Sequence, residues 1–173
     1  MGVLILFALA IFSSAALLFL VQPMAAKMAL PIFGGSPAVW NTSMLFFQAA
    51  LLLGYLYAHL TTRYLRPLAQ VIVHAMFAGA AFMALPLAMP SGDVSTWSQT
   101  PITSMLRFLA IAVGVPFLFT STAGPLLQRW FSTTGHRQAA DPYFLYAASN
   151  AGSLRGLLAY PFLIEPSIKL SAQ

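Results

Sequence analysis

The run GVLILFALAIFSSAALLFLVQ, residues 2–22, decides the fold class, because it carries no charged side chain. A helix needs about 20 apolar residues to cross the hydrocarbon core of a bilayer. No basic segment precedes the run, and it has no clear small-residue cleavage site. We therefore interpret it as a retained transmembrane helix and not as a signal peptide.

Four further apolar runs follow, at residues 39–60, 67–89, 102–130 and 143–164. Short polar or turn-rich segments separate most of them, and short connections make successive helices antiparallel. No strand pattern occurs, and lipid would not tolerate an open sheet. The sequence predicts an all-α, polytopic integral membrane helical bundle of about five transmembrane helices. Residues 1–173 would form a single transmembrane domain.

Composition agrees with this fold and excludes several classes of function. The chain is 60% hydrophobic and only 6% charged, whereas soluble domains carry about 25% charged residues. The absence of cysteine excludes disulfides, thiolate metal sites and cysteine nucleophiles. The basic residues are scattered over the loops and form no patch, so we expect no nucleic-acid partner. The expected surroundings are membrane lipids and other membrane subunits.

The basic residues also predict an orientation. One side of the membrane would hold the N-terminus and the following residues: Arg63, Arg66, Arg129, His136 and Arg137. The other side would hold Lys27, Asp93, Arg107, Glu165 and Lys169. The small excess of positive charge on the first side favours a cytoplasmic N-terminus.

A connector rich in proline and glycine, QPMAAKMALPIFGGSPAVW, follows the first run. We expect Pro23 to end the first helix. Residues 24–33 would then form a short interfacial or re-entrant segment, with Lys27 turned toward water and no acid near it in the sequence.

The second half of this connector predicts a sharp turn and a new helix. Gly34 and Gly35 permit a chain reversal. Ser36 and Pro37 are typical of a helix cap and a first turn. Trp40 is expected to anchor the second helix at the membrane interface.

The fourth run contains Pro116 and Pro125, which should kink its helix. One interpretation is a helix that bends to fit its neighbours. The alternative is a hinge or a broken helix that lines a cavity.

Candidate catalytic groups are sparse in this sequence. All three acids, Asp93, Asp141 and Glu165, fall outside the apolar runs, so we predict no proton relay within the membrane. No glycine-rich phosphate loop occurs. We expect no enzymatic activity and see no evident cofactor, although lipid or pigment contacts stay open. His74 is the histidine expected within the membrane; it could ligate a metal, haem or chlorophyll-type magnesium, but one hydrogen bond to a neighbouring helix is more typical.

The fifth run predicts a helix interface. Ala148, Gly152 and Gly156 recur every four residues, and the two glycines form the Gly-x-x-x-Gly pattern of closely packed membrane helices. Asn150 could hydrogen-bond across such a contact. The contact would lie either inside the bundle or against a partner subunit.

Arg155 lies near the middle of the same run, where an arginine costs roughly 2.5–3.5 kcal/mol even on the milder insertion scale. A compensating group is therefore expected. Asn150, backbone carbonyls, a water-filled cleft, a lipid headgroup or an acid on another chain could serve. Snorkelling toward the interface is the alternative.

Three blocks of the sequence are distinctive: FLVQPMAAKMALPIFGGSPAVWNTSMLFFQAALLLGYLYAH, GPLLQRWFSTTGHRQAADPYFLYAASNAGSL and LLAYPFLIEP. They resemble the N-terminal membrane region of bacterial fused transporter-like/spermidine-synthase-like proteins. The resemblance implies a piece of a major-facilitator-type bundle in a bacterial inner membrane, cytoplasmic or intracytoplasmic. More helices and usually an aminopropyltransferase-like domain follow in that family.

This chain departs from the family pattern in two respects. It ends at EPSIKLSAQ and has no synthase-like domain, so no catalytic residue carries over. We expect either a natural short protein or the N-terminal part of a longer chain. Arg155 also stands where relatives would be expected to carry an aliphatic residue.

These observations predict a non-catalytic accessory or structural subunit that packs against a larger membrane complex, photosynthetic or respiratory. Two alternatives stay open. The chain could be a transporter-like membrane module, or the membrane anchor of a spermidine-synthase-like protein.

Overall fold

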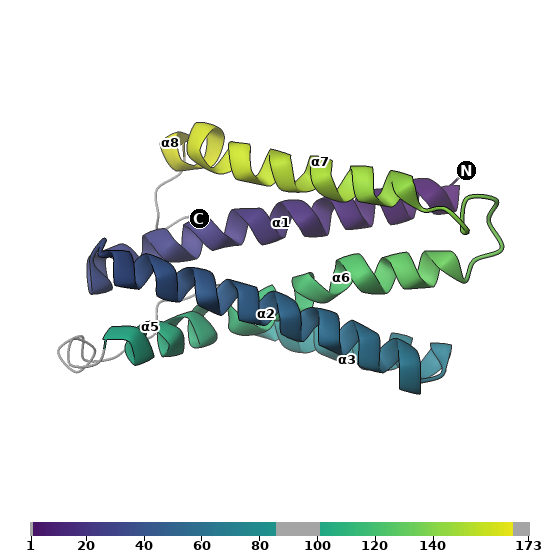
Figure 1. Cartoon of the computed structure of the whole chain (residues 1–173), viewed down its shortest axis with the longest axis horizontal. Helices are drawn as coiled ribbons and strands as arrows, with labels where there is room; N and C mark the ends of the chain where they lie inside the picture. The colour runs from purple at the N-terminus through teal and green to yellow at the C-terminus, as the bar shows by residue number, and fades with distance from the viewer. Residues whose placement is uncertain (1, 86–100, 168–173) are drawn as a thin grey trace.

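The computed structural model describes residues 2–85 and 101–167, which form a bundle of helices without a strand (Figure 1). The α-helices are α1 (Gly2–Phe33), α2 (Pro37–Tyr64), α3 (Pro67–Met83), α5 (Pro101–Leu109), α6 (Val115–Ser132), α7 (Tyr143–Ala159) and α8 (Glu165–Ser167). Two π-helical turns, η1 (Ala110–Gly114) and η2 (Tyr160–Ile164), join α5 to α6 and α7 to α8. The predicted all-α fold is confirmed.

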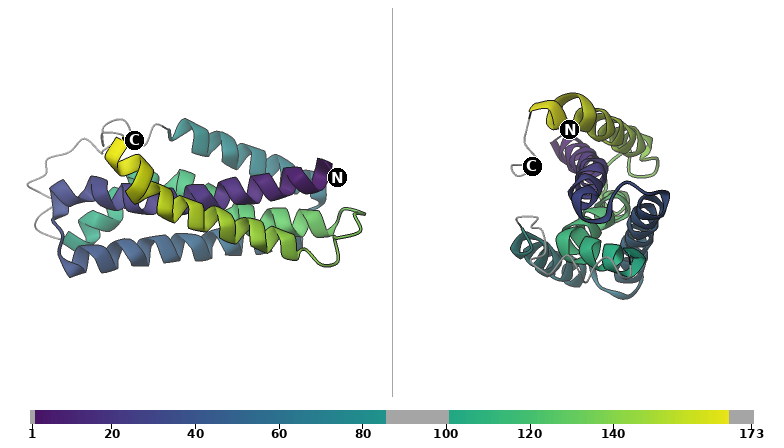
Figure 2. Two further views of the ribbon diagram at one scale, coloured as in Figure 1. Left: turned by 90° about the horizontal axis from the view of Figure 1, so that it is seen from above. Right: turned by 90° about the vertical axis from the view of Figure 1, so that its left-hand side faces the viewer.

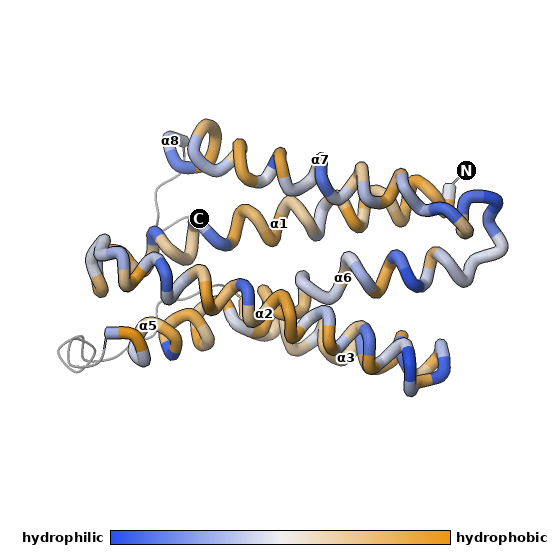
Figure 3. Tube along the Cα trace, in the orientation of Figure 1, coloured by the Kyte–Doolittle hydropathy of each residue, from blue (hydrophilic) through white to orange (hydrophobic). Residues whose placement is uncertain are grey.

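Three helical stretches are long and apolar enough to cross a membrane: α1, α2 and the continuous stretch from α5 through η1 to α6. Helix α3 is apolar but shorter. Only 11% of the most apolar stretch of α1 is buried inside the protein, so most of its hydrophobic surface needs another apolar environment. Hydrophobic residues line the helices, while the loop from α6 to α7 is mostly hydrophilic (Figure 3).

Successive helices run in alternating directions, as predicted, so α1 and α7 are parallel (Figure 1). The main contacts, however, are not between sequence neighbours. Helix α1 packs chiefly on α7 and α6, and α2 packs chiefly on α6 and α5 (Figure 2). The larger core cluster joins α1 and α2 to the α5–α6 stretch, and a smaller one joins the start of α1 to α6 and α7.

The predicted end of the first helix at Pro23 is wrong. Helix α1 continues to Phe33 and contains both Pro23 and Pro31. The segment expected at the interface is instead part of the core, where Ala25 and Ala29 are fully buried against α2 and α5. Proline removes one helical hydrogen bond. Membrane helices tolerate this loss where neighbouring helices pack around them.

The turn after α1 agrees with the sequence. Gly34 has a φ of +73°, which favours glycine, and its N–H donates to the carbonyl of Leu30 at 2.9 Å. Ser36 then caps α2 by accepting the N–H of Val39 at 3.4 Å, and Pro37 occupies the first turn. Helix α2 therefore begins where its sequence signals place it.

One other helix prediction needs correction. The sequence predicts α3 over residues 67–89, but the helix ends at Met83, so residues 84 and 85 are not helical. Residues 86–89 lie outside the described residues. The irregularity near Pro116 takes the form of the π-turn η1, which precedes it directly. Proline cannot donate to the carbonyl four residues earlier, and a π-turn accommodates that lost bond. Pro125, in contrast, lies within an uninterrupted α6. Hinge motion at either proline stays a prediction.

Candidate functional site

The parallel helices α1 and α7 touch at backbone level. Gly152 and Gly156 are both buried. A Cβ atom on Gly152 would collide with the carbonyl oxygen of Phe12, and one on Gly156 with that of Ala16. Such contact requires residues without side chains. The Gly-x-x-x-Gly contact therefore lies inside the bundle, which settles the alternative that the sequence left open.

The remaining residues predicted at this interface do not share its face. Ala148 is half-buried, on the same side as the glycines. Asn150 is exposed and lies about 140° around the helix from Arg155, at 3.6 residues per turn. Asn150 therefore neither bridges the α1–α7 contact nor faces Arg155.

Arg155 lies on the exposed flank of the α1–α7 contact. It borders a shallow groove of about 300 Å³ whose other walls include Ser13, Leu17 and Leu20 of α1. Among the described residues, Lys27 and Glu165 form the only salt bridge, so no carboxylate in that part of the chain pairs with Arg155. It stands about 18 Å along the axis from the start of α7.

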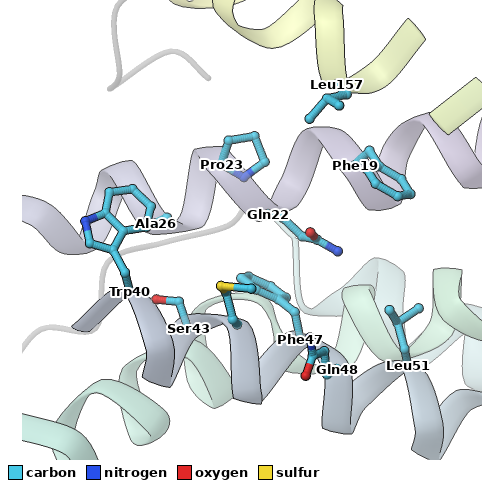
Figure 4. Close-up of a pocket in the computed structure, with 11 residues that line it drawn as sticks. Phe19, Gln22, Pro23, Ala26, Trp40, Ser43, Phe47, Gln48, Leu51 and Leu157 are labelled. Atoms are coloured by element: carbon cyan, nitrogen blue, oxygen red, sulfur yellow. The ribbon is translucent and has the colours of Figure 1, made fainter. Parts of the chain in front are cut away.

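A second hollow opens between α1 and α2, with one residue of α7 at its edge (Figure 4). Its volume is about 440 Å³, and an adjoining cavity of about 350 Å³ shares Pro23, Trp40 and Leu157 with it. The adjoining cavity extends to Lys27 and Glu165. We refer to the two together as the α1–α2–α7 cleft.

The walls of the cleft are mostly apolar but include two amides. Gln22 comes from α1 and Gln48 from α2 (Figure 4), and neither makes a hydrogen bond to another described residue. The hydroxyl of Ser43, by comparison, donates to the carbonyl of Val39 at 3.0 Å. Each glutamine therefore presents a donor and an acceptor to whatever fills the cleft.

An ion pair stands at one end of the cleft. The Nζ of Lys27 on α1 lies 2.5 Å from Oε1 of Glu165 on α8. The side chains are 33% and 43% exposed, so both charges stay accessible from outside the bundle. No acid lies near Lys27 in the sequence, and the fold brings Glu165 to it from 138 positions away.

His74 belongs to an aromatic cluster between α2, α3 and α6. Its ring stacks on Phe119 with centroids 4.9 Å apart, and the ring of Trp130 meets its edge at 5.7 Å. Its Nδ1 atom and the hydroxyl of Tyr57 are buried without a hydrogen-bond partner in the described structure. The described residues contain no group of three potential metal ligands. The packing explains the ring's position, and ligation by His74 stays a prediction.

Sequence reasoning missed three residues of the cleft: Gln22, Gln48 and Glu165. A signal existed for each. Glutamine within an apolar run is itself unusual, and interhelical hydrogen bonding is its common role. The orientation predicted from the basic residues places Lys27 and Glu165 on the same side of the membrane, which is a precondition for their pairing.

No family model, curated protein or solved structure matches the chain. The resemblance to fused transporter-like/spermidine-synthase-like proteins therefore stays a prediction, and the function must be argued from the geometry above.

Proposed function

We propose that this chain is a non-catalytic membrane subunit that packs against a larger membrane assembly through the exposed flank of α1 and α7. The observation that supports the proposal is Arg155, an exposed arginine in the middle of α7 with no acidic partner in the described residues. The α1–α7 contact uses the glycines and leaves the guanidinium outside the bundle.

The position of Arg155 favours a protein partner over snorkelling. Glu165 is about 15 Å away along the helix, too far for contact. Either end of the helical stretch is also more than about 10 Å away, beyond the reach of an arginine side chain from mid-helix. A carboxylate on a neighbouring helix, seated in the groove beside Ser13 and Leu17, would compensate the charge with a bidentate pair.

The proposal is tested by site-specific crosslinking in native membranes. A photo-reactive residue at Leu17 should capture one membrane protein, and the capture should fall when Arg155→Leu is introduced. Arg155→Glu should abolish capture. Exchange of the partner's acidic residue for arginine should then restore it, because the charges are reversed together.

Two controls keep the result specific. Asn150→Leu removes a polar group from the opposite side of α7 and should leave capture unchanged. A photo-reactive residue at Met76, exposed on α3, should not capture the same protein. Undiminished capture in Arg155→Leu would contradict the proposal.

A second candidate function is a transporter-like module, and the α1–α2–α7 cleft favours it. The cleft offers two unpaired amides at positions within apolar helices, which is an arrangement that could hold a small solute. Uptake by proteoliposomes that contain the chain alone would support this function. Loss of that uptake in Gln48→Leu would assign it to the cleft.

Other features of the proposal rest on the sequence. They are a bacterial inner-membrane location, a cytoplasmic N-terminus, a photosynthetic or respiratory assembly, and the alternative role as anchor of a spermidine-synthase-like protein. In support of the orientation, Arg63, Arg66 and Arg129 lie at the ends of helices on the side of the N-terminus (Figure 1). Protease or label accessibility at that end tests it.

A further inference from the structure

We propose that the α1–α2–α7 cleft binds one phospholipid with a zwitterionic headgroup that carries a primary ammonium, as in phosphatidylethanolamine. This inference is independent of the protein partner proposed above, because Arg155 lies in a different groove. It rests on three chemical features that follow one another along the cleft. They are an ion pair, two amides and an apolar inner end.

The ion pair supplies complementary charges for such a headgroup. Lys27 offers an ammonium and Glu165 a carboxylate, side by side and partly exposed. A lipid phosphate can bind Lys27 while the lipid ammonium binds Glu165, so that each charge meets an opposite one. A headgroup that carries only negative charge would be attracted by Lys27 but repelled by the carboxylate of Glu165.

The amides lie deeper in the cleft than the ion pair. Gln22 is about 7 Å along α1 from Lys27, and Gln48 is about 12 Å along α2 from Trp40. The headgroup region of a bilayer leaflet is about 5–7 Å thick, and the glycerol esters lie at its inner edge. The side-chain N–H groups of Gln22 can therefore donate to an ester carbonyl, which is an acceptor only. Gln48 lies deeper than the esters by the same measure.

The innermost part of the cleft suits an acyl chain. Phe19, Leu51 and Leu157 line it, and these residues come from three different helices (Figure 4). The cleft is open on one side and not enclosed, so a chain could enter laterally from the bilayer. Its mostly apolar walls match the hydrocarbon of such a chain.

The test compares lipids on the unaltered protein, delipidated in detergent and examined by native mass spectrometry. With identical chains, phosphatidylethanolamine should bind at least about tenfold more tightly than phosphatidylcholine, since a trimethylammonium cannot donate the charge-assisted hydrogen bond to Glu165. Diacyl phosphatidylethanolamine should also bind more tightly than its dialkyl ether analogue, which lacks ester carbonyls.

Variants then assign each preference to its residue. Glu165→Gln should remove the preference for ethanolamine over choline. Gln22→Leu should remove the preference for ester over ether while keeping that for ethanolamine. Arg137→Gln, which changes the net charge by one unit in the opposite direction and lies in the loop at the other end of the bundle, should alter neither.

Two outcomes would overturn the inference. Equal binding of all lipids would mean that the cleft binds acyl chains and does not distinguish one headgroup from another. Preferred binding of phosphatidylglycerol would mean that Lys27 alone attracts an anionic lipid. Both outcomes are read on the unaltered protein, so a variant that fails to fold does not affect the decision.

Discussion

The backbone contact between α1 and α7 makes a sharp prediction about Gly152→Ala. The added Cβ would overlap with the carbonyl oxygen of Phe12 and lie 3.0 Å from the carbonyl carbon. Both groups belong to helix backbone, so no flexible side chain can turn away, and the helices must separate. Overpacking of this kind costs about 1–3 kcal/mol. We expect a loss near 2 kcal/mol in the free energy of unfolding.

The same geometry predicts how two such changes combine. Gly156→Ala should cost about as much as Gly152→Ala, because its Cβ would meet the backbone of Ala16 in the same way. The double variant should lose less than the sum, since the first methyl already opens the gap into which the second projects.

Reversible unfolding in mixed micelles of a mild detergent and sodium dodecyl sulfate, followed by tryptophan fluorescence, measures these losses. Gly79→Ala in α3 and Gly124→Ala in α6 are matched controls, because a Cβ on either glycine meets no atom within 4 Å. They should change stability by less than about 0.5 kcal/mol. If Gly152→Ala has the same free energy of unfolding as these controls, the close α1–α7 contact is refuted.

Three other predictions follow from single contacts. Gly54→Ala should destabilise the bundle, because its methyl overlaps with the side chain of Ser121, and Gly54→Ala with Ser121→Gly should restore most of the loss. A double-mutant cycle on Lys27 and Glu165 should give a coupling below about 1 kcal/mol that falls with salt, since both side chains are a third or more exposed. Zero coupling at low salt would mean that the pair does not form. His74→Phe should unfold within about 1.5 kcal/mol of the unaltered protein, because a ring still packs on its neighbours; a change in the visible absorption of the purified protein would indicate ligation instead.

Local signals in the sequence were sufficient for much of the fold. Long apolar runs predicted the helices, and the order Gly34, Gly35, Ser36, Pro37 predicted the end of one helix and the start of the next. These features depend on residues near one another in the chain. The apolar runs also led to the alternating helix directions, because short connections leave little choice.

Tertiary packing accounts for what local signals missed. Pro23 is a helix-ending signal only where nothing compensates the lost hydrogen bond, and burial of Ala25 and Ala29 does so here. The pair of Lys27 with Glu165 depends on the placement of α8 beside α1, which no local pattern specifies.

The candidate site was likewise half predictable. Gly152 and Gly156 identified a close helix contact, because only glycine permits backbone approach. Their partner helix could not be chosen from the spacing, since any apolar helix in the bundle would serve. Arg155 could be singled out from its position in the sequence alone. The cleft could not, because side chains from three helices form its walls.

The pairing of α1 with α7 has a consequence for biosynthesis. Helix α1 emerges from the ribosome before α7, and the glycines that cover its flank at Phe12 and Ala16 follow 140 residues later. At bacterial and eukaryotic synthesis rates this interval lasts roughly 7–30 s. Throughout it, that flank of α1 faces lipid or a substitute helix, including α7 of a neighbouring copy. Correct assembly therefore depends on keeping nascent chains apart until their own α7 has been synthesised.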